Sequence, residues 1–319
     1  MRQLNIGLLG CGRIGGGFVE VIETQAIKDR LAARAGLELK VVGALVKNLT
    51  KARPAGVNVT TDPEDLLNDR GIDIFVETMG GVEPATEYAM KALARGKHVV
   101  SSNKAMVATS HTELRELAAR THAYLLFEAS VGGGVPIIRT LLSKPFRVHR
   151  IEAVLNGTTN WVLGQMELNG LRLEEALAIA QANGYAEPDP QEDIDGTDAA
   201  YKLCILAAVG LDRYFPPDDI LHFGIQDLTV ADVKAALLER KRYKLIARAG
   251  LSGPSTLEMS IKPELVRADS FLGRVEGIQN GFVISDDIGE TLLLGKGAGV
   301  RPTASSLLDD VVSLAPYAR

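Results

Sequence analysis

Residues 4–15 read Leu4-Asn5-Ile6-Gly7-Leu8-Leu9-Gly10-Cys11-Gly12-Arg13-Ile14-Gly15, an apolar run that passes directly into a glycine-rich loop. The apolar run is typical of a β-strand, and the residues after the loop have a helical pattern. Glycines at this spacing permit a tight turn, close approach of the backbone to a pyrophosphate, and close packing of helix on strand. The helix N-terminus adds unpaired N–H groups that attract phosphates. The loop Gly10–Gly15 is therefore predicted to bind a dinucleotide rather than to be an ordinary turn.

The rest of the first half alternates short β-rich runs with helical patterns. The predicted strands are Leu4–Leu9, Leu39–Val46, Ile72–Glu77, His98–Ser101 and Tyr124–Glu128, and the predicted helices are Gly16–Ala35, Pro63–Asp69, Pro84–Arg95 and Thr109–Arg120. Short apolar strands that alternate with helices form a parallel sheet covered on both faces. The sequence thus predicts an α/β fold with a Rossmann-type domain.

The pattern changes near Gly132–Pro136, and the second half mixes helices with strands. The predicted helices there are Ile137–Leu142, Leu173–Asn183, Asp198–Val209 and Thr303–Leu314, and the predicted strands are Arg147–Leu155, Leu257–Lys262, Gly281–Ser285 and Glu290–Gly295. This mixture predicts an α+β domain. We expect a dinucleotide-binding domain over residues 1–130, joined by a returning helix at 300–319, and a substrate-binding, catalytic and dimerisation domain over residues 131–299.

Composition limits the class of protein. The chain has 319 residues, 46% of them hydrophobic and 24% charged, with a net charge of −5. It lacks the excess of basic residues that nucleic-acid binding requires, and no apolar run approaches the roughly 20 residues of a membrane span. Its two cysteines cannot form a disulfide framework or a four-cysteine zinc site. We expect a cytoplasmic protein that acts on a small molecule and binds neither nucleic acid nor membrane.

The end of the second predicted strand usually selects between NAD and NADP. An acidic residue there binds the ribose 2′-hydroxyl, whereas a basic residue accommodates a 2′-phosphate. Here the strand is followed by Lys47-Asn48-Leu49-Thr50-Lys51, which contains no acid. Lys47, Lys51 and Arg13 together favour NADP, although a solvated basic loop would look the same and NAD stays open.

The segment from Ala182 to Lys202 combines several acids with one lysine. Its prolines and glycines predict a loop over residues 182–196, and a helix follows. Asp198 and Lys202 are four residues apart and so share one face of that helix. Because residues 203–209 are apolar on every face, the helix should be largely buried, and its first charges should face a cleft. A lysine in such a place can exchange a proton with a substrate oxygen.

A second lysine, Lys104, follows the predicted strand His98–Ser101. The carboxyl ends of parallel strands line the ligand crevice in this class of fold. By itself Lys104 would be read as an exposed loop residue. Together with Lys202 from the other domain, it could stabilise the negative charge that develops on the oxygen of an aldehyde during hydride transfer.

These motifs resemble those of the homoserine dehydrogenase family. The most specific match is the segment from Ala182 to Lys202, which ends Asp193-Ile-Asp-Gly196-Thr-Asp198-Ala-Ala-Tyr-Lys202. Supporting matches, in the family's order, are the loop Gly10–Gly15, Glu77–Gly81, Ser102–Lys104, Asn156–Asn160, Gly297–Gly299 and Pro302–Ser305. Together they span nearly the whole chain.

The resemblance implies NAD(P)-dependent interconversion of L-aspartate 4-semialdehyde and L-homoserine, in threonine and methionine biosynthesis. It makes Lys202 the proton donor to the aldehyde oxygen and places Lys104 against both substrate and nicotinamide. Glu187 and Asp198 would hold the substrate's amino group and the lysine network, with Asp193 in the same acidic set. The expected cofactor-binding residues are Gly10, Gly12, Arg13, Ile14, Gly15, Lys47, Thr78, Ser102, Lys104, Gly184 and Gly299.

The resemblance also implies a sodium ion and a homodimer. Glu128, Val131, Gly133 and Val135 match the ion's ligand positions, mostly through backbone carbonyls. Oxygen ligands of this kind suit a hard cation better than zinc, although the same segment could serve as a hinge loop. The dimer would form through the sheet of the second domain. The chain stops soon after the returning helix, so we expect no C-terminal regulatory domain and no threonine feedback through one.

Two other functions stay open on the sequence alone. One is a two-domain NAD(P)-dependent dehydrogenase with a different aldehyde or ketone substrate, against which the Glu187–Lys202 segment argues. The other is a dinucleotide sensor that kept the fold but catalyses nothing. Such a sensor would have no need of both Lys104 and Lys202.

Overall fold

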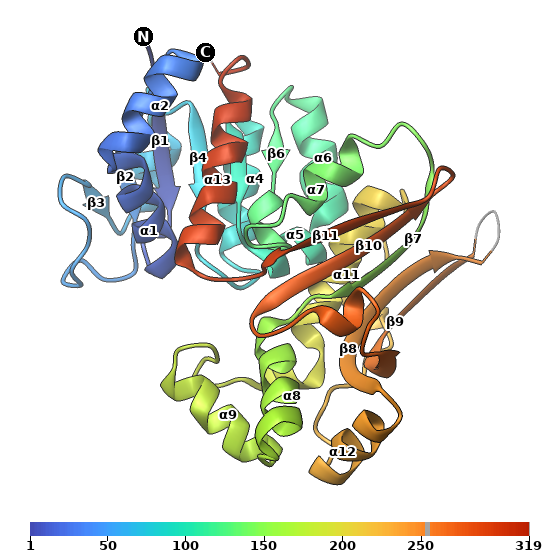
Figure 1. Cartoon of the computed structure of the whole chain (residues 1–319). Helices are drawn as coiled ribbons and strands as arrows, with labels where there is room; N and C mark the ends of the chain where they lie inside the picture. Colours follow the sequence, from blue (N-terminus) through green and yellow to red (C-terminus); the bar gives the residue numbers. More distant parts are fainter. Residues whose placement is uncertain (253–255, 319) are drawn as a thin grey trace. The chain divides into compact units, whose positions relative to one another are not determined.

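The computed structural model describes residues 1–252 and 256–318, and the chain divides into two units. Unit 1 comprises Met1–Gly134 and Gly299–Arg319, and unit 2 comprises Val135–Ala298. Figure 1 shows the chain coloured along its sequence. Each unit is built around its own sheet. The C-terminal segment belongs to the same unit as the N-terminal strand.

Unit 1 contains a six-stranded parallel sheet with the order β3-β2-β1-β4-β5-β6. The strands are β1 (Arg2–Leu9), β2 (Leu37–Leu45), β3 (Val59–Thr60), β4 (Ile74–Glu77), β5 (His98–Ser101) and β6 (Leu125–Leu126). This is the strand order of a doubly wound dinucleotide-binding fold, and the predicted Rossmann-type sheet is confirmed. The strand order reverses between β1 and β4, and ligands bind beside such a point at the carboxyl ends of the strands.

Helices cover both faces of this sheet (Figure 1). One face carries α1 (Arg13–Glu23), α2 (Gln25–Ala35) and α13 (Val300–Leu314), and the other carries α3 (Pro63–Leu67), α4 (Ala85–Ala94) and α6 (His111–Arg120), with the short α5 (Lys104–Thr109) before α6. On the first face, Ile6 of β1, Phe18 of α1 and Leu307 of α13 belong to one buried apolar cluster. This shared core fixes the first turn of α1 against the carboxyl end of β1.

The single helix predicted over Gly16–Ala35 is wrong, because α1 and α2 are separate. Thr24 lies between them with φ −65° and ψ 127°, an extended conformation. Its N–H donates to the carbonyl of Val21, and its hydroxyl donates to the carbonyl of Glu20 at 3.0 Å. The β-branched threonine thus ends one helix and precedes the next.

Unit 2 contains a five-stranded antiparallel sheet with the order β11-β10-β7-β8-β9. The strands are β7 (Val148–Val154), β8 (Lys241–Leu251), β9 (Leu257–Arg267), β10 (Gln279–Asp286) and β11 (Glu290–Lys296). The helices are α7 (Ile137–Leu142), α8 (Gly157–Asn169), α9 (Leu173–Ala182), α10 (Gln191–Asp195), α11 (Thr197–Gly210) and α12 (Val230–Leu238). The buried α11 packs on β7 and β8, and α8 packs on β8 and β10. The predicted α+β character of this half is confirmed.

The loop predicted over residues 182–196 is wrong in part. Residues Gln191–Asp195 form the short helix α10. Pro190 precedes it, and Gly196, with φ 96°, ends it in the left-handed region. Proline before a helix and glycine after it are ordinary boundaries, so these residues delimit a helical turn instead of excluding one.

Short 3₁₀ turns complete the description at Glu128–Ser130, Pro217–Asp219 and Leu272–Arg274. Within residues 1–252 and 256–318, no helix combines the length and the apolar character that crossing a membrane requires.

Candidate functional site

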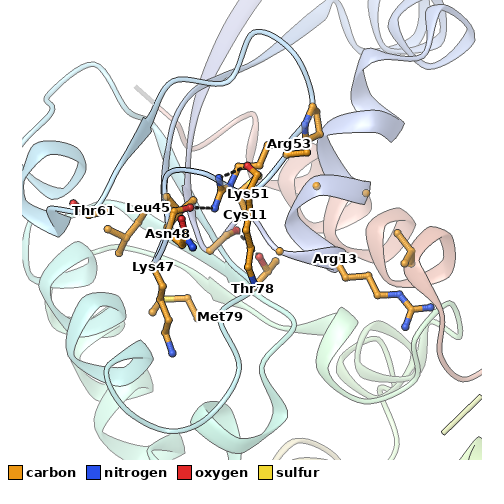
Figure 2. Close-up of a pocket in the computed structure, with 18 of the residues that line it drawn as sticks. Cys11, Arg13, Leu45, Lys47, Asn48, Lys51, Arg53, Thr61, Thr78 and Met79 are labelled. Atoms are coloured by element: carbon orange, nitrogen blue, oxygen red, sulfur yellow. Dashed lines mark hydrogen bonds between the residues drawn. The ribbon is translucent and has the colours of Figure 1, made fainter. Parts of the chain in front are cut away.

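A cavity of about 1170 Å³ opens in unit 1 where β1, β2 and β4 end. Gly10, Gly12 and Arg13 line it after β1, Lys47 after β2, and Thr78 after β4. Figure 2 shows several of these side chains around the cavity. The volume exceeds that of an ordinary small-ligand pocket, and the position is the switch point of the sheet. A dinucleotide-sized ligand fits this place.

Two glycines of the loop have different surroundings. A Cβ added to Gly12 would meet no heavy atom within 4 Å, so this backbone faces open space. A Cβ added to Gly15 would collide with the carbonyl oxygen of Gly10 and lie 2.7 Å from Oγ1 of Thr78. Gly15 therefore lets α1 approach the strand ends, whereas Gly12 leaves room for a ligand at the helix N-terminus. The close packing of helix on strand that the glycine spacing predicts is seen at Gly15, and the approach of backbone to a pyrophosphate stays a prediction.

A basic loop borders the same cavity. Lys47, Lys51 and Arg53 line it, and Glu20 is the one acidic side chain among the described lining residues. The guanidinium of Arg53 donates to the carbonyl of Lys51 at 2.7 Å and to that of Asn48 at 2.5 Å (Figure 2). Arg53 thus closes the loop on itself, and the two lysines contribute their charge beside the cavity.

Arg53 was not among the basic residues predicted from the sequence, the last of which is Lys51. The run of three basic residues at 47, 51 and 53 was the available signal. Cys11 also lines the cavity, and burial raises the pKa of its thiol. A neutral thiol suits a packing role for Cys11 better than a nucleophilic one.

The other residues predicted to bind the cofactor lie outside the described lining of the cavity. Ile14, Gly15, Ser102, Lys104 and Gly299 belong to unit 1 but not to the cavity lining that the structure describes. Val300, directly after Gly299, does line it. Gly184 belongs to unit 2, where it follows α9 with φ 72°. For these residues the assignment stays a prediction.

A buried carboxylate, Glu77, organises the loops after β4 and β5. It is 0% exposed at the end of β4. It accepts hydrogen bonds from Oγ of Ser101 at 2.6 Å, the backbone N–H of Met79 at 2.7 Å and Nδ2 of Asn103 at 3.3 Å. Burial raises the pKa of Glu77, and these donors oppose that rise. The carboxylate therefore joins the carboxyl ends of the neighbouring strands β4 and β5.

Asn103 extends this arrangement to Lys104. Its Oδ1 accepts from the backbone N–H of Met106 at 3.1 Å, which makes Asn103 the N-cap of α5. Lys104 is the first residue of that helix. Lys104 was predicted from the sequence, whereas the supporting roles of Glu77 and Asn103 were not, although both residues lie in the motifs Glu77–Gly81 and Ser102–Lys104.

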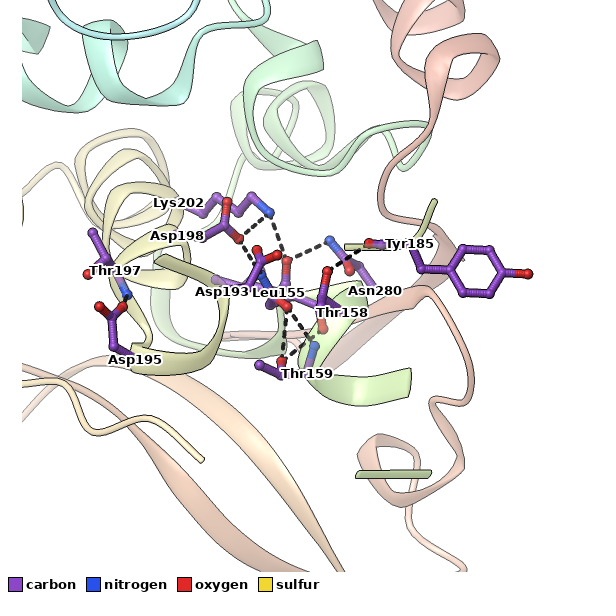
Figure 3. A network of polar contacts seen from close by, with 11 residues as sticks. Leu155, Thr158, Thr159, Tyr185, Asp193, Asp195, Thr197, Asp198, Lys202 and Asn280 are labelled. Carbon is purple, nitrogen blue, oxygen red and sulfur yellow. Dashed lines mark hydrogen bonds and ion pairs between the residues drawn. The ribbon is translucent and has the colours of Figure 1, made fainter. Parts of the chain in front are cut away.

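In unit 2, Lys202 forms the predicted ion pair with Asp198. Lys202 Nζ lies 2.7 Å from Oδ2 of Asp198 and donates to the carbonyl of Leu155 at 2.9 Å. The side chains are 12% and 5% exposed, so the pair is more than a solvated surface contact. Figure 3 shows both acceptors beside the lysine nitrogen. The carbonyl of Leu155 also accepts from Nδ2 of Asn280 at 3.0 Å.

Asp193 joins this pair through Asn156. Nδ2 of Asn156 donates to Oδ1 of Asp193 at 2.6 Å and to Oδ2 of Asp198 at 2.9 Å. Burial, and then the nearby charge of Asp198, raise the pKa of Asp193, and the hydrogen bond from Asn156 lowers it. Asp193, Asp198 and Lys202 thus form one cluster, as the sequence analysis predicted.

Glu187 lies apart from the hydrogen bonds of this cluster. It is exposed on the loop before α10, and its backbone carbonyl accepts from Nε2 of Gln181 at 3.1 Å. Its predicted contact with the substrate's amino group stays a prediction.

The four residues predicted to hold sodium, Glu128, Val131, Gly133 and Val135, are all buried. The carbonyl of Gly133 accepts from Oγ of Ser306 at 2.5 Å, while Val135 belongs to unit 2. Among the residues that the structure describes, no three histidine, cysteine, aspartate or glutamate side chains gather in a way that could hold a metal ion. A site made mainly of carbonyl oxygens is a different kind of site from such a side-chain group.

Two family models match consecutive parts of the chain. The model described as "Homoserine dehydrogenase, NAD binding domain" matches residues 10–128, and the model described as "Homoserine dehydrogenase" matches residues 136–312. Homoserine dehydrogenase of Synechocystis is 38% identical over 320 residues, which cover 98% of this chain and 73% of that protein. That of Helicobacter pylori is also 38% identical, and the match covers 98% and 74% of the two chains.

Solved structures agree with these matches. A homoserine dehydrogenase from Thiobacillus denitrificans has a TM-score of 0.93 and 38% identity, and covers 98% of this chain and 73% of its own. A hyperthermophilic archaeal homoserine dehydrogenase in complex with NADPH has a TM-score of 0.83 and 29% identity, and covers 100% and 99% of the two chains.

The two loop glycines give opposite expectations for alanine variants. Gly12→Ala should fold normally and lower dinucleotide affinity roughly 10-fold or more, because the new methyl group occupies the space left for phosphate. Gly15→Ala should lower the free energy of unfolding by about 1–3 kcal/mol, since its methyl group meets backbone. Calorimetric titration with NADPH and thermal unfolding of both variants measure this. Destabilisation by Gly12→Ala together with normal NADPH binding would contradict the assignment.

Proposed function

The chain belongs to the homoserine dehydrogenase family, and from this premise we propose that it interconverts L-homoserine and L-aspartate 4-semialdehyde with a nicotinamide dinucleotide. The observation that carries the proposal is the match of both family models to successive segments, over residues 10–128 and 136–312. The two halves of the chain offer the two parts that such a reaction needs. These are a cavity at the switch point of unit 1 and a buried lysine–carboxylate cluster in unit 2. The reaction serves threonine and methionine biosynthesis.

The dinucleotide fits the residues of unit 1. The open space beside Gly12 accommodates pyrophosphate at the N-terminus of α1, with Gly10, Arg13 and Thr78 around it. When bound in reduced form, the dinucleotide supplies the hydride that reduces the aldehyde carbon. We assign the dinucleotide to unit 1 and the amino acid substrate to unit 2.

Lys202 is the proposed proton donor. As the aldehyde is reduced, its oxygen gains negative charge, and the ammonium of Lys202 stabilises that charge and then passes its proton to it. Asp198 and the carbonyl of Leu155 hold the nitrogen at 2.7 and 2.9 Å and so fix the direction of the donor. In the oxidation of homoserine, the neutral amine takes the proton back from the hydroxyl.

Three further residues complete the proposed site. Lys104, at the start of α5, is assigned to contact both substrate and nicotinamide. Glu187 and Asp193 are assigned, with Asp198, to the substrate's amino group and the acidic network. Carboxylates are the natural partners of an ammonium group.

NADP is the proposed physiological dinucleotide. Lys47 and Lys51 line the cavity at the end of β2, where an acid would otherwise bind the ribose of NAD. Arg53 holds the loop that carries them. The complex of the archaeal relative with NADPH agrees with this choice.

A sodium ion is also proposed, held by Glu128, Val131, Gly133 and Val135. The burial of Glu128 and Val131 and the oxygen character of the donors suit a hard monovalent cation. The ion would order this segment, and no step of the reaction uses it.

We propose that the protein is a cytoplasmic homodimer. Leu292 and Leu294 of β11 are 48% and 49% exposed, and exposed apolar side chains on a sheet are typical of a contact surface. Cys11 and Cys204 are both buried and not joined in a disulfide, and a reducing compartment maintains thiols in this state.

The activity itself has a direct test. Steady-state assays with L-homoserine should show reduction of NADP, and more slowly of NAD, followed by the absorbance of the reduced nicotinamide. L-Serine and L-threonine serve as matched hydroxy amino acids and should be oxidised at least ~100-fold less efficiently. Faster oxidation of another substrate would favour a different dehydrogenase, and NADPH binding without turnover would favour a sensor.

The proton donor has a test of its own. Lys202→Ala should lower kcat about 10²- to 10⁴-fold, because general acid catalysis is lost, and leave NADPH affinity nearly unchanged. Since this variant leaves Asp198 without its lysine, Lys202→Arg provides a second case. Arginine keeps the positive charge but does not release a proton near neutral pH, so turnover should be lost there as well. Full activity in either variant would reject Lys202 as proton donor.

The choice of cofactor can be tested at the basic loop. The double variant Lys47→Ala/Lys51→Ala should raise the KM for NADP about 10- to 100-fold through lost hydrogen bonds to phosphate, and leave the KM for NAD nearly unchanged. Lys40→Ala is the matched control, because Lys40 is an exposed lysine of β2 outside the cavity lining. Equal changes for NAD and NADP would show that these lysines do not select the 2′-phosphate.

A further inference from the structure

Asn156 holds together the charged groups of the cluster in unit 2. It is 4% exposed and directly precedes α8. Its Oδ1 accepts from the backbone N–H of Thr159 at 2.8 Å, which makes it the N-cap of α8. An asparagine N-cap needs only this oxygen. The amide nitrogen is therefore available for a second task.

The amide nitrogen bridges two carboxylates from different helices. It lies 2.6 Å from Oδ1 of Asp193 in α10 and 2.9 Å from Oδ2 of Asp198 in α11. One –NH₂ group has two hydrogens, so each carboxylate receives one. The same oxygen of Asp198 accepts from Lys202. Two buried negative groups this close repel each other unless donors lie between them.

The residue before Asn156 completes the arrangement. The carbonyl of Leu155 accepts from Nζ of Lys202 at 2.9 Å, so residues 155 and 156 contact every charged member of the cluster. Thr158, in the first turn of α8, also lowers the pKa of Asp193, and its hydroxyl donates to the carbonyl of Tyr185 at 3.0 Å. The charged groups around the amide are thus Asp193 of α10 and Asp198 and Lys202 of α11.

We propose that Asn156 is a positioning residue for the reaction: by dividing its amide hydrogens between Asp193 and Asp198, it bridges the two carboxylates and holds the Lys202–Asp198 pair in the orientation that proton transfer requires. This inference rests on the proposed function, because it concerns the same site. It gives the Asn156–Asn160 motif a chemical role beyond capping.

The two tasks of Asn156 can be separated by substitution. Serine at this position retains an oxygen that accepts from the N–H of Thr159 but offers the carboxylates no amide, whereas alanine loses both. Asn156→Ala should lower the Tm by about 2–4 °C and also lower kcat. Asn156→Ser keeps the cap and should lose less Tm than Asn156→Ala, yet it should lower kcat about 10- to 100-fold, because a misplaced proton donor slows the reaction.

The pH profile supplies a readout that a merely structural role would not move. The hydrogen bond from Asn156 lowers the pKa of Asp193, so its loss should raise that pKa. The acidic limb of the kcat profile should then move to higher pH by about one unit in Asn156→Ser. The affinity for NADPH should stay within about twofold of wild type, because Asn156 belongs to unit 2.

Asn169→Ser is the matched control. Asn169 is the exposed last residue of the same helix, and its amide donates to Gln165. This variant should keep wild-type kcat and pH profile. A wild-type kcat and pH profile in Asn156→Ser would overturn the inference, as would losses of kcat in the serine and alanine variants that simply follow their losses of Tm.

The test distinguishes this inference from the proposed function. If the wild-type protein does not oxidise homoserine, the proposed function fails before any variant is compared. If the wild-type protein is active and Asn156→Ser equals it at every pH, the positioning role alone is rejected.

Discussion

The need to give buried carboxylates hydrogen-bond donors shapes both candidate sites. In unit 1, Glu77 is fully buried and receives a hydrogen bond from Asn103. In unit 2, Asp193 and Asp198 receive hydrogen bonds from Asn156. A buried charge without such partners costs several kcal/mol (roughly 3–5 when a partner is removed), so the chain must place donors there. The loops at these strand ends are consequently ordered by their polar contacts.

In both units an asparagine supplies the hydrogen-bond donor to the buried carboxylate. Asn103 caps α5 and Asn156 caps α8 with the side-chain oxygen, and each uses its amide nitrogen on an acid. Each helix begins within a few residues of a strand end, after β5 or β7. One asparagine side chain thus fixes the start of a helix and the orientation of a carboxylate at once. In unit 1 the next residue is Lys104, and in unit 2 the carboxylate of Asp198 holds Lys202.

Features that depend on local pattern were predictable, and features that depend on distant partners were not. The bounds of β5 and α7 are as predicted, and so is the i,i+4 pair of Asp198 and Lys202, because apolar periodicity and helix geometry determine them. The strand β8 was not predicted, since its first residues, Lys241–Lys244, look like a charged loop. The bridging role of Asn156 was also hidden, because its partner Asp198 lies 42 residues further along the chain.

The buried Lys244 is one reason why the sequence did not predict β8. It also holds α8 in place. Its Nζ donates to Oδ1 of Asn160 at 2.7 Å and to the carbonyl of Val275 at 2.5 Å, and burial lowers its pKa to about 8. Asn160 in turn donates to the carbonyl of Gly277 at 2.8 Å. The first turn of α8 is therefore attached twice, to the acidic cluster through Asn156 and to the sheet through Asn160. Because rotation of the helix would break both attachments, the sheet of unit 2 restrains the orientation of the groups around Lys202.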